Sequence, residues 1–259
     1  MTNWGTRRRN FIITIVLMTI IIIVGIFGYT FFYQEPTCFD GVRNGLEVGI
    51  DCGGDCRLIC ADRSLEPLVK WNRFFEVAPG VYNTVAYLEN QNTDSGTEML
   101  KYRITLFDDK NVILAEREGF TKIWPREVIP IFEGSFVTNQ SIATRMTFEL
   151  TNLAELEWVK IKPKESIISI LNQKLTNVEA SPRVSATVKN IGYSDVPDLK
   201  LVAILYNSEG NAVGASSTFI EYLKENQEVD VLFSWPQDFK ENVARSEIFS
   251  IYDQEKLID

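Results

Sequence analysis

The chain has 259 residues, of which 45% are hydrophobic and 24% are charged, and this leaves room for an anchor and two modest domains. The net charge is −9. Residues 1–33 hold three arginines and no acidic residue, so the rest of the chain carries −12. An acidic surface excludes nucleic-acid binding through phosphates, which needs Lys and Arg. The absence of histidine excludes Ser-His-Asp and Cys-His nucleophile systems and His-ligated metals, so we expect no enzyme.

The first predicted element is a membrane-spanning helix over residues 11–33. These 23 residues contain no charge, and at about 1.5 Å per residue they cross the ~30 Å hydrocarbon core of a bilayer. Arg7, Arg8 and Arg9 precede the segment. The positive-inside rule therefore predicts a single-pass protein of the cell membrane with a cytoplasmic tail (residues 1–10) and an extracytoplasmic C-terminus.

A cleaved signal peptide is the alternative interpretation of this segment. The apolar cores of signal peptides are ~7–15 residues long and end at a cleavage site of small residues. Here the apolar run is longer and ends in aromatic residues, without an A-x-A site. We therefore expect an uncleaved anchor, with the lipid bilayer as the partner of residues 11–33.

A small Cys-rich module is expected at residues 36–60, which hold every cysteine of the chain and five glycines. A glycine-rich segment of this length forms turns, cannot bury a core and needs cross-links or a metal. Disulfides form and persist outside the cytoplasm. We therefore expect two disulfides, with the pairing open and Cys38 with Cys52 as one example. The four candidates are Cys38, Cys52, Cys56 and Cys60.

Two other uses of these cysteines are weaker. A zinc site favours paired C-x2-C knuckles, whereas the spacing here is C-x13-C-x3-C-x3-C. A catalytic redox pair needs a C-x-x-C motif, which the module lacks.

The module resembles a Cys-rich motif of secreted and surface proteins, C-x-D-G-x-x-N-G-x-E-x-G-x-D-C-G-G-x-C. The match covers about a tenth of the chain. The resemblance implies an exported module and supplies no enzymatic activity. The matching residues are Cys38, Asp40, Gly41, Asn44, Gly45, Glu47, Gly49, Asp51, Cys52, Gly53, Gly54 and Cys56.

Four residues of the module are also candidate ligands for calcium: Asp40, Asn44, Glu47 and Asp51. Calcium prefers hard oxygen ligands on flexible loops. The spacing does not follow the EF-hand pattern, and Asp and Asn are common turn formers. We therefore expect turn chemistry, keep calcium as an alternative, and predict no other cofactor.

Period-two apolar patterns, broken every ~8–12 residues, predict β-strands from Leu65 onward. The expected class is all-β, with two tandem β-sandwich domains at residues 66–163 and 164–259. The boundary is placed near Pro163–Ser166, with a short and stiff linker. The expected strands are Val81–Glu89, Leu100–Phe107, Val112–Arg117, further strands within 136–150, and Glu157–Ile161.

Landmarks recur about 100 residues apart, which predicts a tandem duplication. Val85–Asn90 lies beside Ser185–Asn190, and Ile104–Asp108 beside Ala203–Asn207. Two later pairs complete the alignment: Thr147–Leu150 with Val231–Ser234, and Glu157–Ile161 with Ile248–Tyr252. The pattern of strands, asparagines and turns resembles the immunoglobulin-like and fibronectin-like domains of bacterial surface proteins.

A contact loop is predicted at residues 120–135, which look longer than their counterpart in the second domain. Binding residues are often found in insertions on a rigid scaffold, so Trp124, Pro125 and Arg126 are candidate partner-binding residues. Core packing is the alternative for the tryptophan.

The sequence therefore predicts a membrane-anchored, non-catalytic binding or scaffold protein of the cell envelope, with another envelope protein or a polymer as its partner. The alternative is an accessory subunit of a secretion or pilus-type machine, in which the anchor itself makes the contacts. Gly25 and Gly28 are spaced i, i+3 and do not form the G-x-x-x-G of packed membrane helices, which favours a plain anchor.

Overall fold

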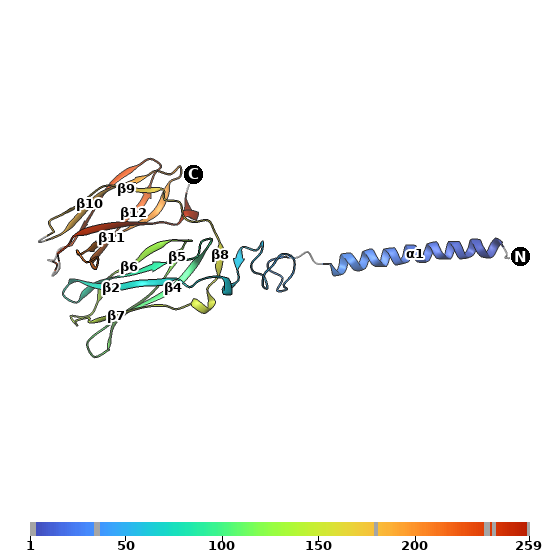
Figure 1. The fold of residues 1–259 in the computed structure, drawn as a ribbon, viewed down its shortest axis with the longest axis horizontal. Helices are drawn as coiled ribbons and strands as arrows, with labels where there is room; N and C mark the ends of the chain where they lie inside the picture. Colours follow the sequence, from blue (N-terminus) through green and yellow to red (C-terminus); the bar gives the residue numbers. More distant parts are fainter. Residues whose placement is uncertain (1–3, 34–36, 179–180, 236–238, 240–241, 258–259) are drawn as a thin grey trace. The chain divides into compact units, whose positions relative to one another are not determined.

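The structure is a computed structural model that describes residues 4–33, 37–178, 181–235, 239 and 242–257. The chain forms two compact units, Met1–Cys56 and Arg57–Asp259. The first begins with an apolar helix, and the second is built from antiparallel strands (Figure 1). The expectation of a mostly β protein with one N-terminal apolar helix is therefore confirmed.

Helix α1 (Trp4–Phe32) includes a stretch, Arg7–Phe31, that is long and apolar enough to cross a membrane. Its mean hydropathy is 3.0. The hydroxyls of Thr14 and Thr19 donate to the carbonyls of Asn10 and Ile15, so they leave no unpaired donor in an apolar environment. A signal sequence meets the same length and composition criteria.

The expected Cys-rich module divides between the two units after Cys56. Up to Cys56 it consists of turns and one isolated bridge, Gly49 to Cys52, as its glycine content predicts. Beyond it, β1 (Leu58–Ile59) pairs with β8 (Trp158–Lys160) in the second unit.

The first half of the second unit contains two sheets. One has the order β1-β8-β4-β5, with β7 also paired to β4, and the other has the order β2-β3-β6. The side chains between them form one core, which includes Leu88, Leu100 and Ile104. The strands are β2 (Leu68–Ala78), β3 (Val81–Glu89), β4 (Ser95–Phe107), β5 (Ile113–Ile123), β6 (Val128–Val137) and β7 (Arg145–Leu150).

The second half repeats this arrangement with the sheets β13-β10-β9 and β12-β11-β14. A second core fills the space between them and includes Val184, Leu201 and Phe233. The strands are β9 (Ile168–Thr176), β10 (Arg183–Asn190), β11 (Val196–Tyr206), β12 (Ala212–Leu223), β13 (Glu228–Ser234) and β14 (Arg245–Ile251). Short 3-10 helices lie at Ala61–Arg63, Leu153–Glu155 and Gln254–Lys256.

The two halves share one strand order. In the first half β3 pairs with β2 and β6, and β4 pairs with β5 and β7. In the second half β10 pairs with β9 and β13, and β11 pairs with β12 and β14. Strands β2 to β7 therefore correspond in order to β9 to β14.

Two buried asparagines make the same bonds in both halves. The amide of Asn90 donates to the carbonyls of Ser95 and Trp124, at 2.8 and 2.9 Å. The amide of Asn190 donates to the carbonyls of Ser194 and Leu223, at 2.8 and 3.2 Å. Each side-chain oxygen also accepts a bond from the backbone N–H two residues on. The expected match of these residues at strand ends is correct.

The turns after β4 and β11 also match. Asp108 accepts hydrogen bonds on its carboxylate from the N–H groups of Lys110 and Val112. Asn207 accepts them from Glu209 and Asn211. These side chains take the place of a missing backbone partner at each turn, which is the usual role of Asp and Asn there.

Two of the aligned strand pairs were wrong. Thr147–Leu150 lies in β7, which pairs with β4 and corresponds to β14, whereas Val231–Ser234 lies in β13 beside β10. Strand β8 borders β1 and β4, and β14 borders β11, so Glu157–Ile161 does not correspond to Ile248–Tyr252. The pattern of alternating residues is similar in each of these strands and does not reveal which neighbour a strand joins.

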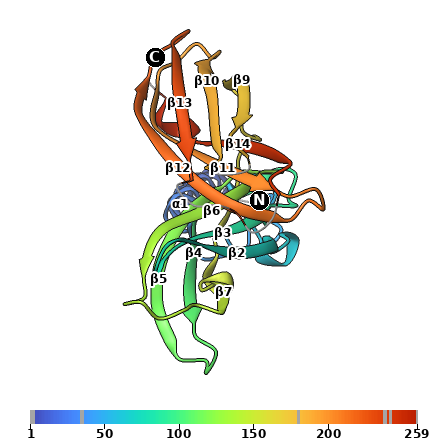
Figure 2. The ribbon, with the colours of Figure 1, turned by 90° about the vertical axis from the view of Figure 1, so that its left-hand side faces the viewer.

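A third core joins the halves. The face of β2-β3-β6 that points away from the first core packs on the face of β12-β11-β14 that points away from the second core. It buries Val85 and Phe132 of the first half against Val202 and Ile204 of the second. The four sheets therefore form successive layers (Figure 2). The chain was expected to have two cores joined by a linker, and this shared core was missed.

Candidate functional site

The Cys-rich module is held by disulfides. Cys38 is bonded to Cys56, 18 residues away, with the two Cα atoms 5.6 Å apart. Cys52 and Cys60 are disulfide-bonded as well, and the described residues include no free cysteine. The expectation of two disulfides is confirmed, but the example pairing of Cys38 with Cys52 was wrong. Sulfurs that are oxidised in this way are not ligands for zinc.

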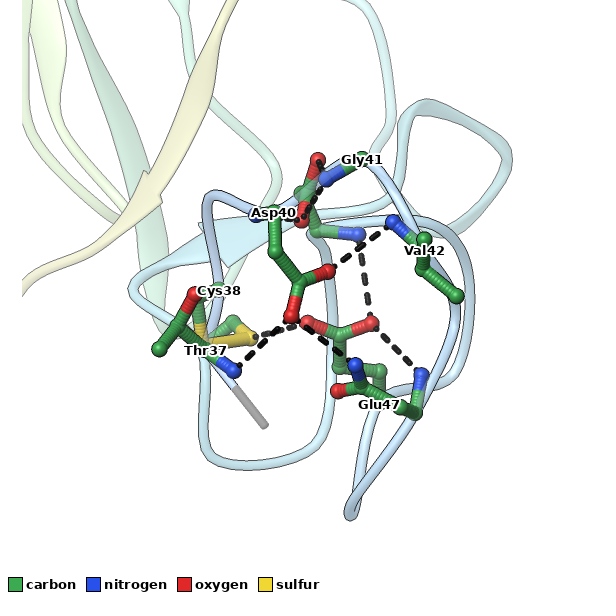
Figure 3. The surroundings of a disulfide bond; sticks show 9 residues. Thr37, Cys38, Asp40, Gly41, Val42 and Glu47 are labelled. Carbon is green, nitrogen blue, oxygen red and sulfur yellow. Dashed lines mark hydrogen bonds between the residues drawn. A yellow bond between two sulfur atoms is a disulfide. The ribbon is translucent and has the colours of Figure 1, made fainter. Parts of the chain in front are cut away.

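Two aspartates stabilise the turns of the module from within. The carboxylate of Asp51 accepts hydrogen bonds from the backbone N–H groups of Asp40 and Gly41, at 3.0 Å each. The carboxylate of Asp40 accepts bonds from the N–H of Val42 and from the side-chain amide of Asn44, at 2.9 and 2.8 Å (Figure 3). The Asn44 amide, followed by the Val42 N–H, holds the pKa of Asp40 below its ordinary value.

Glu47 links this network to the disulfide. One carboxylate oxygen accepts bonds from the N–H groups of Asn44 and Asp51, at 3.2 and 3.3 Å. The other lies 3.5 Å from the sulfur of Cys56. Glu47 therefore fixes the middle of the loop against its cross-link, as Figure 3 shows.

The four expected calcium ligands do come together, but their carboxylate oxygens bond to N–H groups of the loop. Asp40, Glu47 and Asp51 each accept at least two such bonds. The side-chain oxygen of Asn44 is buried without a hydrogen-bond partner among the described residues. The arrangement matches the turn chemistry expected for these residues.

Gly54 is the most constrained glycine of the module. Its φ is +56°, and a Cβ atom there overlaps the carbonyl oxygen of Leu46. We expect Gly54→Ala to prevent the native pairing of Cys38 with Cys56 in most chains. The measurement is thiol alkylation and disulfide mapping of the exported full-length protein.

Gly41→Ala is the matched control for this variant. Gly41 also has a positive φ, +72°, but no atom lies within 4 Å of the position of its Cβ. This variant carries the left-handed strain alone, about 1 kcal/mol, and we expect it to keep the native disulfides. Equal mispairing in both variants contradicts the proposed clash at Leu46.

The predicted contact loop is a tight turn between β5 and β6. Glu127 donates its backbone N–H to the carbonyl of Trp124. In the second half Gln227 makes the same bond to Lys224, so the first half contains no insertion here. Trp124 is only 5% exposed and Pro125 is buried, which leaves Arg126 exposed. The longer loop was therefore a wrong expectation, because residues 120–135 are mainly strand.

The turn between β5 and β6 is in contact with the linker and with the C-terminal segment of the same chain. The ammonium group of Lys122 lies over the ring of Trp124, 4.5 Å from its centre, and forms an ion pair with Glu255 at 2.6 Å. Lys164 of the linker forms an ion pair with Glu127 at 3.4 Å, and both side chains are nearly buried. Burial lowers the pKa of Lys164, and Glu127 opposes this shift. The linker and the C-terminal segment thus pack on the first half.

A polar hollow of about 390 Å³ opens beside the core that joins the halves. Lys200 lines it and donates to the carbonyl of Phe132 at 2.9 Å, and burial lowers the pKa of this lysine. Glu133 also lines it, but its carboxylate accepts bonds from Tyr102 and Arg117. Both charged groups are therefore already engaged in holding strands together.

No family model matches the chain, and no curated protein matches it. Similar solved structures include a beta-glucuronidase from glycoside hydrolase family 2, at 8% identity and a TM-score of 0.23, over 87% of this chain and 28% of that one. They also include red sea bream transglutaminase, at 8% identity and a TM-score of 0.22, over 76% of this chain and 31% of that one. The chain spans less than a third of either protein, and similarities this weak indicate neither fold nor activity.

Proposed function

We propose that the chain is a single-pass membrane protein whose C-terminal part lies outside the cytoplasm and serves as a non-catalytic binding or scaffold protein of the cell envelope. The observation that carries this proposal is the disulfide bonding of all four cysteines soon after a helix of membrane length. Disulfides persist in oxidising compartments and are rare in the cytosol. The helix is then an anchor, with Arg7–Arg9 on its cytoplasmic side.

The two halves of the sheet unit are, in this proposal, tandem immunoglobulin-like sandwich domains. Their shared strand order and the matching bonds of Asn90 and Asn190 support a duplication. The core around Val202 and Ile204 joins them, so the pair offers one stiff surface to another envelope protein or to a polymer.

A non-catalytic role is supported by the way the charged groups are used. Lys164 and Lys200 are lysines with lowered pKa values, and each donates to a group of the first half across the junction. The sequence contains no histidine to act as an acid or base near neutral pH.

The alternative, an accessory subunit of a secretion or pilus-type machine, has less support. It needs an anchor that packs on other helices through a polar or small-residue face. The threonine hydroxyls of α1 bond to their own helix, and Gly25 and Gly28 do not form a G-x-x-x-G motif.

The orientation can be tested by labelling full-length protein in intact spheroplasts with a membrane-impermeant maleimide. The two variants are Tyr193→Cys and Trp4→Cys, at positions that are 91% and 77% exposed. We expect Tyr193→Cys to be labelled before the membrane is permeabilised and Trp4→Cys only afterwards. The reverse pattern overturns the orientation, and a mature protein that lacks residues 1–33 by intact mass overturns the anchor.

A further inference from the structure

The Cys-rich module exposes five large apolar side chains between Phe39 and Ile50. Phe39 is 82% exposed, Leu46 72%, Ile50 63%, Val42 59% and Val48 42%. They lie within twelve consecutive residues of the sequence. Single exposed apolar residues are ordinary on a soluble protein, but so many in so small a module need an explanation.

Three of the four carboxylates of the same module face inward, and Asp55 is exposed. Asp40, Glu47 and Asp51 are half-buried, and they accept bonds from backbone N–H groups of the loop. Much of the module's polar bonding is therefore internal, while its apolar side chains point outward. This is the reverse of the usual distribution in a protein domain surrounded by water.

The chain keeps this module next to the end of α1. Only residues 34–37 separate Tyr33 from Cys38. A fully extended chain covers at most ~3.6 Å per residue, so Cys38 lies within ~18 Å of the helix end. Headgroup regions extend ~5–8 Å beyond each side of the hydrocarbon core, and the module cannot move far from them.

We propose that the exposed apolar side chains of the module insert into the headgroup and acyl boundary of the leaflet from which α1 emerges. This inference rests on the proposed function, because it requires α1 to span the bilayer. The lipid surface lies within reach of the module in every copy of the chain, whereas a second copy has to be recruited. The module contains four acidic residues and two basic residues, Arg43 and Arg57, so insertion depends on apolar area rather than on anionic lipid.

The test uses full-length protein in liposomes of zwitterionic phosphatidylcholine. p-Benzoylphenylalanine replaces Phe39 or Leu46 in two separate variants, and an exposed acidic position of the module, Asp55, in the control. After irradiation, mass spectrometry identifies the cross-linked product. We expect lipid adducts at Phe39 and Leu46, several-fold more frequent than at Asp55, and equally frequent when a fraction of anionic lipid is added.

Adducts to a second copy of the chain, or equal lipid adducts at all three positions, overturn the inference. So does a lack of adducts in variants whose disulfide map shows the native pairing of Cys38 with Cys56. Alkaline carbonate extraction of the same liposomes distinguishes a module that does not insert from a chain that does not span the bilayer. A chain that carbonate releases does not span the bilayer, whereas a retained chain without lipid adducts refutes only the insertion of the module.

Discussion

Asn90→Ala is expected to lower the free energy of unfolding of the sheet unit by about 3 kcal/mol or more. Asn90 is fully buried, and its amide satisfies the carbonyls of Ser95 and Trp124. Its side-chain oxygen accepts bonds from both the backbone and the side chain of Asn92. Alanine leaves several buried polar groups without a partner, each of which costs ~1–3 kcal/mol.

Asn190→Ala should have a similar effect in the second half, because the bonding pattern is the same. Asn152→Ala is the matched control. Asn152 is half-buried and also bonds to two backbone groups, the N–H of Lys101 and the carbonyl of Met99, but these bonds are exposed to solvent. Water replaces these bonds, so we expect a loss of about 1 kcal/mol or less.

Urea unfolding of the detergent-solubilised full-length protein, followed by tryptophan fluorescence, measures these differences. Equal losses for Asn90→Ala and Asn152→Ala contradict the structural role assigned to the buried asparagines. A large loss for only one of Asn90→Ala and Asn190→Ala contradicts the equivalence of the two halves.

Local patterns in the sequence were enough to predict much of the fold. The expected strand Val81–Glu89 is β3 with the same limits, and the landmarks Asn90 and Asp108 stand at equivalent positions to Asn190 and Asn207. Asn and Asp succeed as markers because their side chains bond to the backbone nearby. The glycine content of the Cys-rich module predicted its turns. The clustering of all four cysteines in a segment too short for a core predicted its two disulfides.

Long-range pairing could not be predicted in this way. The pairing of Cys38 with Cys56, and the place of β7 beside β4, depend on how distant segments meet. Trp124 was a candidate contact residue with core packing as the alternative, and the structure buries it, with the linker residue Lys164 and the C-terminal residue Glu255 paired to Glu127 and Lys122 beside its turn. Sequence patterning within one strand contains no information about such neighbours.

One signal for the shared core was present in the sequence. Residues 201–206 of β11 are apolar without alternation, and all of them are buried. An uninterrupted apolar strand is typical of a sheet covered on both faces. In the structure Leu201, Ala203 and Leu205 face the second core, whereas Val202 and Ile204 face the first half. The run therefore records a four-layered packing that two isolated sandwiches do not need.

Disrupting this shared core is expected to uncouple the halves while each half stays folded. Ala215 on β12 is fully buried in the core that joins the halves and does not belong to the second half's own core. In Ala215→Arg, a guanidinium group without a partner replaces a methyl group, and burying it costs at least ~3 kcal/mol. If the halves separate, the arginine becomes exposed to water on the outer face of a folded sheet, so separation is the easier response.

We expect the native full-length protein to unfold in one calorimetric transition and Ala215→Arg to unfold in two, with a loss of about 3 kcal/mol in total stability. Phe219→Arg is the control, because it places the same residue on the same strand at a position that is 54% exposed. This variant should keep one transition. The hydrogen bonds from Arg73 to Asn211 and from Asn83 to Ala215 cross the same junction, so amide and arginine NMR signals from these residues should change in Ala215→Arg alone. One unshifted transition in Ala215→Arg contradicts the coupling, and complete unfolding of both halves shows that they are not independent folding units.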